Sequence, residues 1–188
     1  MRVKIQTLAK NESILGGAPN GRRLFVALIQ NLIPPAEPEA YFLDFAGVQL
    51  ATSSFLRESV LAFRDFVRKQ NPNVYPVIAN AVEAIREELE ILLDARADAL
   101  WACELTEEQQ VRHPKLIGTL DPMQRATFDL VVAHPEVDAP TLAREHGRAH
   151  RVGTTAWNNR LAALAAKGLV VERSAGRSKI YRSLLEGR

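Results

Sequence analysis

Apolar residues recur at helical spacing in three successive segments of the C-terminal part of the chain. An Asp and a Pro open the first segment, and a Gly closes the second, as is usual at helix starts and ends. The pattern predicts helices over residues 121–134, 139–147 and about 153–167. In the third helix, Trp157, Leu161 and Leu164 fall on one apolar stripe, so the opposite side is predicted to be exposed.

Two short segments follow in which apolar and polar residues alternate, which is the pattern of β-strands. They cover residues 169–173 and 178–182, and the residues between them are typical of a tight turn. The predicted two-stranded ribbon therefore carries Arg177 and Lys179 at its tip. From Arg144 to Arg182 there are nine Lys or Arg and two acids, a balance that favours contact with a polyanion.

The exposed side of the third predicted helix is polar without being charged. An Asn amide can bridge the donor and acceptor on an adenine edge, and Thr offers a hydroxyl and a methyl group to bases. Such a face suits a helix that lies in the major groove of double-stranded DNA. The residues that we expect to contact DNA are Arg151, Thr154, Thr155, Asn158, Asn159, Arg160, Arg177 and Lys179.

The run Thr154-Thr155-Ala156-Trp157-Asn158-Asn159-Arg160-Leu161, with Leu164 and Gly168-Leu169-Val170 after it, resembles the winged helix-turn-helix of bacterial transcription regulators. The resemblance covers a little over a third of the chain and implies a DNA-binding domain over residues 120–188. Two features depart from the family pattern. Residues 148–152 predict a longer turn before the third helix, and Trp157 is bulky for a core-facing position.

In the first hundred residues, segments with strand and helix patterns alternate, which predicts an α/β layer with helices packed on a sheet. The predicted strands cover residues 2–8, 41–45, 74–79 and 99–103, and the predicted helices cover residues 22–32, 53–69 and 81–95. The expected organisation is thus an α/β domain over residues 1–103, a polar linker over 104–119 and a mainly α domain over 120–188.

The run from Leu43 to Leu56, LDFAGVQLATSSFL, resembles the signature of STAS-like domains, the class that includes the anti-sigma-factor antagonists. The resemblance implies a STAS-like fold over residues 1–103 and a phosphorylation or partner site at Ser53 and Ser54. Thr52 and Phe55 depart from the antagonist pattern, so the chain is closer to a divergent branch. The favoured interpretation is that the hydroxyl cluster simply caps the following helix.

Composition and scattered polar residues narrow the possible chemistry. The chain has one cysteine and no long apolar run, so we expect a cytoplasmic protein without a disulfide or a membrane partner. Asp44 ends a strand and is expected to hold loop backbone. His146 and His150 need not share a face if their helix ends at Gly147, so no metal site is expected. We expect neither an enzyme nor a cofactor.

Charge and domain pattern together favour one function and leave a second open. Residues 119–188 carry a net charge of +4, and residues 1–118 carry −2. We therefore expect a DNA-binding transcription regulator, in which the STAS-like domain mediates homodimerisation or signal input. The alternative is a phosphorylation-regulated protein-interaction switch of the antagonist type, with a protein partner at the STAS-like domain and the winged helix as a docking module.

Overall fold

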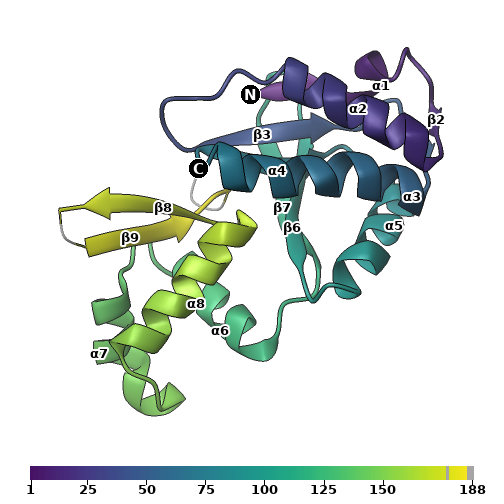
Figure 1. Cartoon of the computed structure of the whole chain (residues 1–188). Helices are drawn as coiled ribbons and strands as arrows, with labels where there is room; N and C mark the ends of the chain where they lie inside the picture. The colour runs from purple at the N-terminus through teal and green to yellow at the C-terminus, as the bar shows by residue number, and fades with distance from the viewer. Residues whose placement is uncertain (177, 186–188) are drawn as a thin grey trace. The chain divides into compact units, whose positions relative to one another are not determined.

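A computed structural model describes residues 1–176 and 178–185 of the chain (Figure 1). The chain forms two compact units, a first unit, Met1–Thr119, and a second unit, Leu120–Arg188. In the described residues, no helix has the length and apolar character needed to cross a membrane.

The first unit is built on a mixed five-stranded sheet, so its class is α/β. Four of its strands are parallel, and the last is antiparallel. A separate parallel pair is formed by β2 (Ile14–Leu15) and β4 (Leu50–Ala51). In spatial order, the strands of the main sheet are β1 (Arg2–Lys4), β3 (Glu39–Asp44), β5 (Val74–Ala79), β6 (Ala99–Leu105) and β7 (Val111–Gly118).

Helices of the first unit pack on one face of this sheet. In the strand register, Leu43, Ile78 and Ala102 are neighbours, and all three belong to the apolar core that the helices share. A continuous helical segment leads from β4 to β5 and contains a π-helical turn in its middle. The helical elements are α1 (Ile5–Leu8), α2 (Ala18–Gln30), α3 (Ser53–Leu56), η1 (Arg57–Leu61), α4 (Ala62–Gln70) and α5 (Glu83–Asp94).

The structure corrects the predicted linker over residues 104–119. Half of that segment is β7, which pairs with β6 and completes the sheet. The sequence of β7 does not show the usual alternation of apolar and polar residues, because β7 is an edge strand and Ile117 is its one fully buried side chain. Pro114 has no N–H to donate to a neighbouring strand, and it is tolerated because the strand lies at the edge of the sheet. The first predicted strand is also shorter, because residues 5–8 turn into α1 and bury Ile5.

The second unit contains three helices and an antiparallel two-stranded ribbon. Asp121 caps the first helix by accepting hydrogen bonds from the N–H groups of Met123 and Gln124, and Asp138 caps the second by accepting from Thr141. Trp157 is completely buried where the helices meet. The elements are α6 (Pro122–Val132), α7 (Ala139–His150), α8 (Thr154–Lys167), β8 (Val170–Ala175) and β9 (Ser178–Ser183).

The prediction that Gly147 ends the second helix is wrong. The helix continues to His150 and ends at Arg151, whose φ of 53° lies in the left-handed region. The Val152 N–H donates to the Gly147 carbonyl at 3.1 Å, which is the Schellman arrangement. A Cβ at Gly147 would lie 3.0 Å from the Val152 carbonyl oxygen, so this glycine accommodates the returning chain. The turn before α8 is consequently short.

Candidate nucleic-acid interface

One side of α8 is anchored in the second unit and the other faces solvent. Trp157, Leu161 and Leu164 are completely buried, and α8 packs on α6, α7 and β8. The helix ends at Gly168, whose φ of 80° favours glycine. The opposite side exposes Thr155, Asn158, Asn159 and Ala162, as the apolar stripe predicts. The packing of α8 therefore fixes which of its polar side chains a ligand can reach.

The two asparagines line a hollow in the surface of the second unit. Asn158 and Asn159 lie on its α8 wall, and Lys179 and Tyr181 lie on its β9 wall. Pro140, at the start of α7, also borders it. Three elements thus surround amide groups that are exposed to solvent, so a base edge or another planar polar group could approach them without rearrangement of the backbone.

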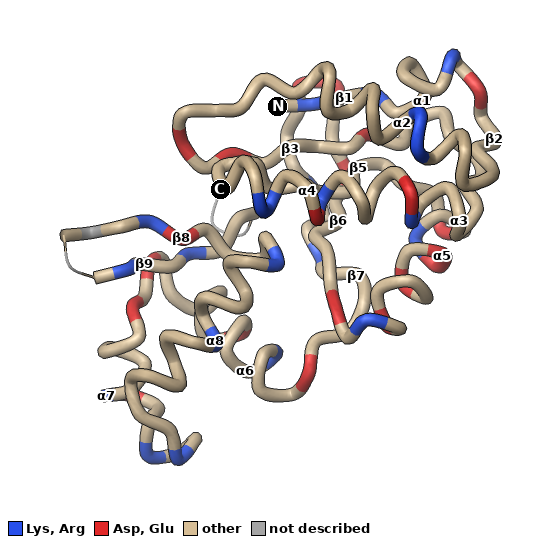
Figure 2. The backbone as a smooth tube through the Cα atoms, viewed as in Figure 1, with Lys and Arg blue, Asp and Glu red and all other residues tan. Residues whose placement is uncertain are grey.

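The first turn of α8 lies next to the basic end of α7. Thr154 and Thr155 are exposed, and so are Arg148 and Arg151, for which no acidic partner exists among the described residues. Figure 2 shows these cationic positions as blue segments at the end of α7. Gly153 is the N-cap and offers no side chain to the first N–H groups of α8, which can therefore donate to an anion such as phosphate.

Arg160 is directed away from the exposed polar side of α8. Its guanidinium lies over the Trp157 ring at 5.1 Å from the centroid, and its Nη2 is 3.3 Å from the Met123 sulfur. The side chain is half-buried by these contacts. The structure thus does not bring Arg160 together with the asparagines, although its sequence position suggested it.

Cations of the ribbon are partly neutralised by acids. Lys179 Nζ lies 2.7 Å from a Glu172 carboxylate oxygen, and Arg173 pairs with Glu136 at 3.1 Å. The Tyr181 hydroxyl donates to Glu172 at 3.0 Å; burial and this carboxylate raise the pKa of Tyr181, so the phenol remains protonated. Lys179 is exposed, as expected, but its charge is partly neutralised by the Glu172 carboxylate. Arg177 lies outside the described residues.

In the first unit, the hydroxyl cluster has the structural role that was favoured from the sequence. The Thr52 side chain caps α3 by accepting from the Phe55 N–H, and the Ser54 hydroxyl lies 3.2 Å from the Thr52 hydroxyl. The Ser53 hydroxyl donates to the carboxylate of Glu88 on α5. A phosphate on Ser53 would therefore lie beside a carboxylate.

Asp44 is buried and fully engaged in holding the carboxyl ends of the strands. Its carboxylate accepts from the Ala46 N–H at 3.0 Å and from the Asn80 amide at 2.8 Å, which confirms the prediction that it holds loop backbone. Arg2 adds an ion pair at 2.7 Å. Nearby, burial above all raises the pKa of Cys103 to about 12, and the thiol therefore stays protonated at neutral pH.

The longer α7 brings together histidines that the sequence analysis had separated. His146 and His150 share a face, with ring centroids 6.4 Å apart, and His134, just after α6, lies equally close to His146. His146 and His150 thus do share a face, contrary to the expectation that rested on a helix end at Gly147. The error came from the misplaced helix end at Gly147, because a four-residue spacing on one helix would otherwise have revealed the pair.

Comparison of the chain with protein-family models, with curated proteins and with solved structures finds no match in any of the three.

Proposed function

We propose that this chain is a DNA-binding transcription regulator whose second unit acts as a winged helix, with α8 as the recognition helix and the β8–β9 ribbon as the wing. The observation that carries the proposal is the solvent-exposed, uncharged face of α8, where Thr155, Asn158 and Asn159 stand side by side on a helix whose other side is locked into the core. A rigidly held polar helix face is what direct readout of base edges requires.

Two kinds of contact would have different roles at this interface, namely reading of the base sequence and binding of the phosphate backbone. Asn158 and Asn159 present amides that match adenine edges and would read sequence. Arg148, Arg151 and the first N–H groups of α8 would bind phosphates and set the register of the helix on the duplex. Because Lys179 pairs with Glu172, the ribbon would contribute less charge than its composition suggests.

The first unit would supply a dimer, since one winged helix contacts too few base pairs for a tight specific site. Apolar side chains on its surface support this role. Val26 on α2 is 49% exposed, Phe66 on α4 is 38% exposed, and Ile33, just beyond α2, is 72% exposed. The STAS-like resemblance supports the same proposal, because it implies a domain of protein interaction and signal input.

A protein-interaction switch of the antagonist type is the second candidate, and Ser53 at the start of a helical segment is the observation that favours it. In its support, a phosphate near a helix start is attracted by free N–H groups. Against it, the Ser53 hydroxyl already donates to Glu88, and a doubly charged group there would be repelled by that carboxylate. We therefore favour the DNA-binding function.

Binding of the full-length chain to genomic duplex fragments at increasing salt tests the proposal. The expected result is an affinity that falls steeply with salt, since phosphate contacts release counterions. Sedimentation of the same protein should show a dimer. A folded protein that fails to bind any duplex at low salt would refute the DNA-binding function, and phosphate on Ser53 in protein from its native host would favour the switch.

A further inference from the structure

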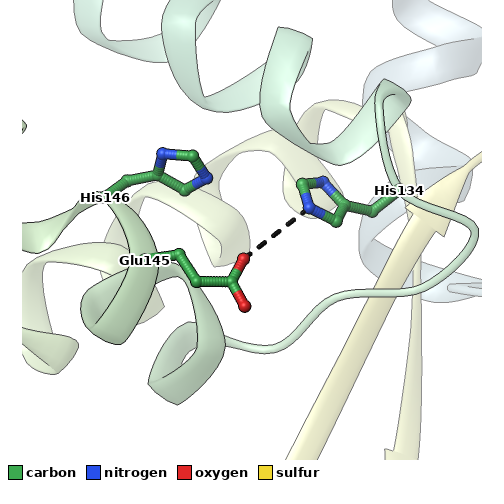
Figure 3. Close-up of side chains that lie close together, drawn as sticks. All are labelled: His134, Glu145 and His146. Atoms are coloured by element: carbon green, nitrogen blue, oxygen red, sulfur yellow. Dashed lines mark ion pairs between the residues drawn. The ribbon is translucent and has the colours of Figure 1, made fainter.

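Three potential metal ligands converge where the end of α6 faces α7. His134 follows the last turn of α6, and Glu145 and His146 are consecutive residues of α7. One ligand atom from each lies within 4.8 Å of the others. Figure 3 shows the Glu145 carboxylate pointing to the His134 ring, with the His146 ring beside them.

Local hydrogen bonds orient these groups as ligands are usually oriented. The Nδ1 of His134 lies 2.6 Å from the Leu130 carbonyl oxygen. A carbonyl can only accept, so Nδ1 carries the hydrogen, and Nε2 is the ring nitrogen that is left to bind a metal. That Nε2 is 3.8 Å from Oε2 of Glu145. A backbone carbonyl behind a ligating histidine is the common outer partner in metal sites.

The other oxygen of Glu145 is already occupied. Its Oε1 lies 3.2 Å from an Arg144 nitrogen, which leaves Oε2 directed at the cluster. The His146 ring is held between two edge-to-face neighbours, His134 and His150, each with its centroid 6.4 Å away. An ion pair between His134 and Glu145 would explain the contact between these two residues. It would not explain why the imidazole of His146 lies beside them.

We propose that His134, Glu145 and His146 bind a divalent transition-metal ion of the zinc class. Two imidazoles and one carboxylate are ligands that Zn²⁺ accepts, and three protein ligands leave a position for water. Tetrahedral coordination places ligand atoms about 3.4 Å apart, so the observed separations need only small side-chain rotations. His134 is 31% exposed and Glu145 is 42% exposed, so both can move and solvent can reach the ion.

An ion at this position would join the end of α6 to α7. It would stabilise the second unit by binding the folded state and not the unfolded chain. Protons compete with the metal for the imidazole nitrogens, so the affinity should fall on acidification. Neither consequence depends on DNA binding, and the site goes beyond the function proposed above.

Titration of the full-length chain, without an affinity tag, with Co²⁺ and Zn²⁺ tests the proposal. The expected result is saturable binding of one ion per chain, Co²⁺ absorption bands typical of nitrogen ligation that Zn²⁺ abolishes, and a higher Tm in Zn²⁺ than in chelator. His146→Ala should weaken metal binding by more than about tenfold, because loss of a residue that only hydrogen-bonds to a metal ligand typically costs at least about tenfold in affinity. Glu145→Gln, which preserves the shape of the side chain, should weaken it similarly.

His113→Ala is the matched control. His113 and Glu104 form a similar exposed pair at 3.9 Å in the first unit, but they do not belong to a three-ligand group among the described residues. This variant should bind the metal like the parent protein. Absence of saturable binding to the folded parent chain would overturn the proposal. So would unchanged affinity in both His146→Ala and Glu145→Gln, since any ion would then be bound elsewhere.

Discussion

Replacing Arg2 by Met should strongly destabilise the first unit, because it leaves the buried carboxylate of Asp44 without its cationic partner. Asp44 is 0% exposed, and Arg2 donates to its carboxylate from Nε at 2.9 Å and from Nη2 at 2.7 Å. Without these bonds the carboxylate keeps, among the described residues, the hydrogen bonds from the Ala46 N–H and the Asn80 amide. Breaking one side of a buried pair typically costs 3–5 kcal/mol. Because Arg2 itself is partly exposed, we expect about 3 kcal/mol.

Urea unfolding followed by a probe of the first unit measures this loss. With a slope of about 2 kcal/mol/M, a loss of about 3 kcal/mol lowers the midpoint by roughly 1.5 M. The control is Arg22→Met, which breaks an ion pair with Glu58 at 3.4 Å whose arginine is 60% exposed. That surface pair should contribute less than about 1 kcal/mol.

The double variant Arg2→Met, Asp44→Asn distinguishes the effect of an unpaired carboxylate from the effect of the lost packing of the Arg2 side chain. An amide has nearly the shape of the carboxylate but carries no charge, so the double variant should recover part of the lost stability. The reasoning is refuted if Arg2→Met lowers the midpoint no more than Arg22→Met does. It is also refuted if Asp44→Asn makes the Arg2→Met protein less stable still.

Three further results are expected. Asp138→Ala should lower the free energy of unfolding by about 1 kcal/mol at pH 7, because it removes the cap of α7. Hydrogen bonds from the Thr141 side chain and N–H lower the pKa of Asp138, so the stabilisation by its carboxylate should be complete above about pH 4 and should be lost as the pH falls through the lowered pKa. Unfolding of the parent and the variant at pH 7 and at a pH below the lowered pKa would show this difference. Arg151→Ala should weaken binding to all duplexes alike and reduce its salt dependence, whereas Arg125→Ala, which removes a cation already paired with Asp129, should change little; equal losses would contradict the assignment. Ser53→Ala should leave DNA affinity unchanged, and a large change in a binding assay would favour the phosphorylation switch.

The second unit was largely predictable because its helices and ribbon are amphipathic. Asp121 gave a correct helix start, and the buried stripe through Trp157 gave the exposed side of α8. The end of α7 was misplaced because Gly147 has two possible roles, helix terminator or site of close backbone approach. Sequence cannot distinguish these roles, since the second depends on where the Val152 carbonyl lies.

Features that depend on contacts between distant residues escaped prediction. The strand β7 has few buried residues and contains Pro114, so it has the composition of a linker. The convergence of His134 with Glu145 and His146 depends on how α6 faces α7. Arg160 was assigned to DNA from its position on α8, but the proximity of the Trp157 ring and the Met123 sulfur determines its direction.

Sequence preference of the full-length chain before and after substitution of the α8 asparagines tests the proposed function most directly. A preferred duplex would first be selected from genomic fragments, and affinities would then be measured on a panel that changes one base pair at a time. Asn158→Ala and Asn159→Ala should each cost about 1–3 kcal/mol on the preferred duplex and flatten the preference at particular base pairs. Asn31→Ala, an exposed asparagine of the first unit, should not. Equal loss of affinity on every duplex, or no loss at all, would contradict the assignment of α8 as the recognition helix.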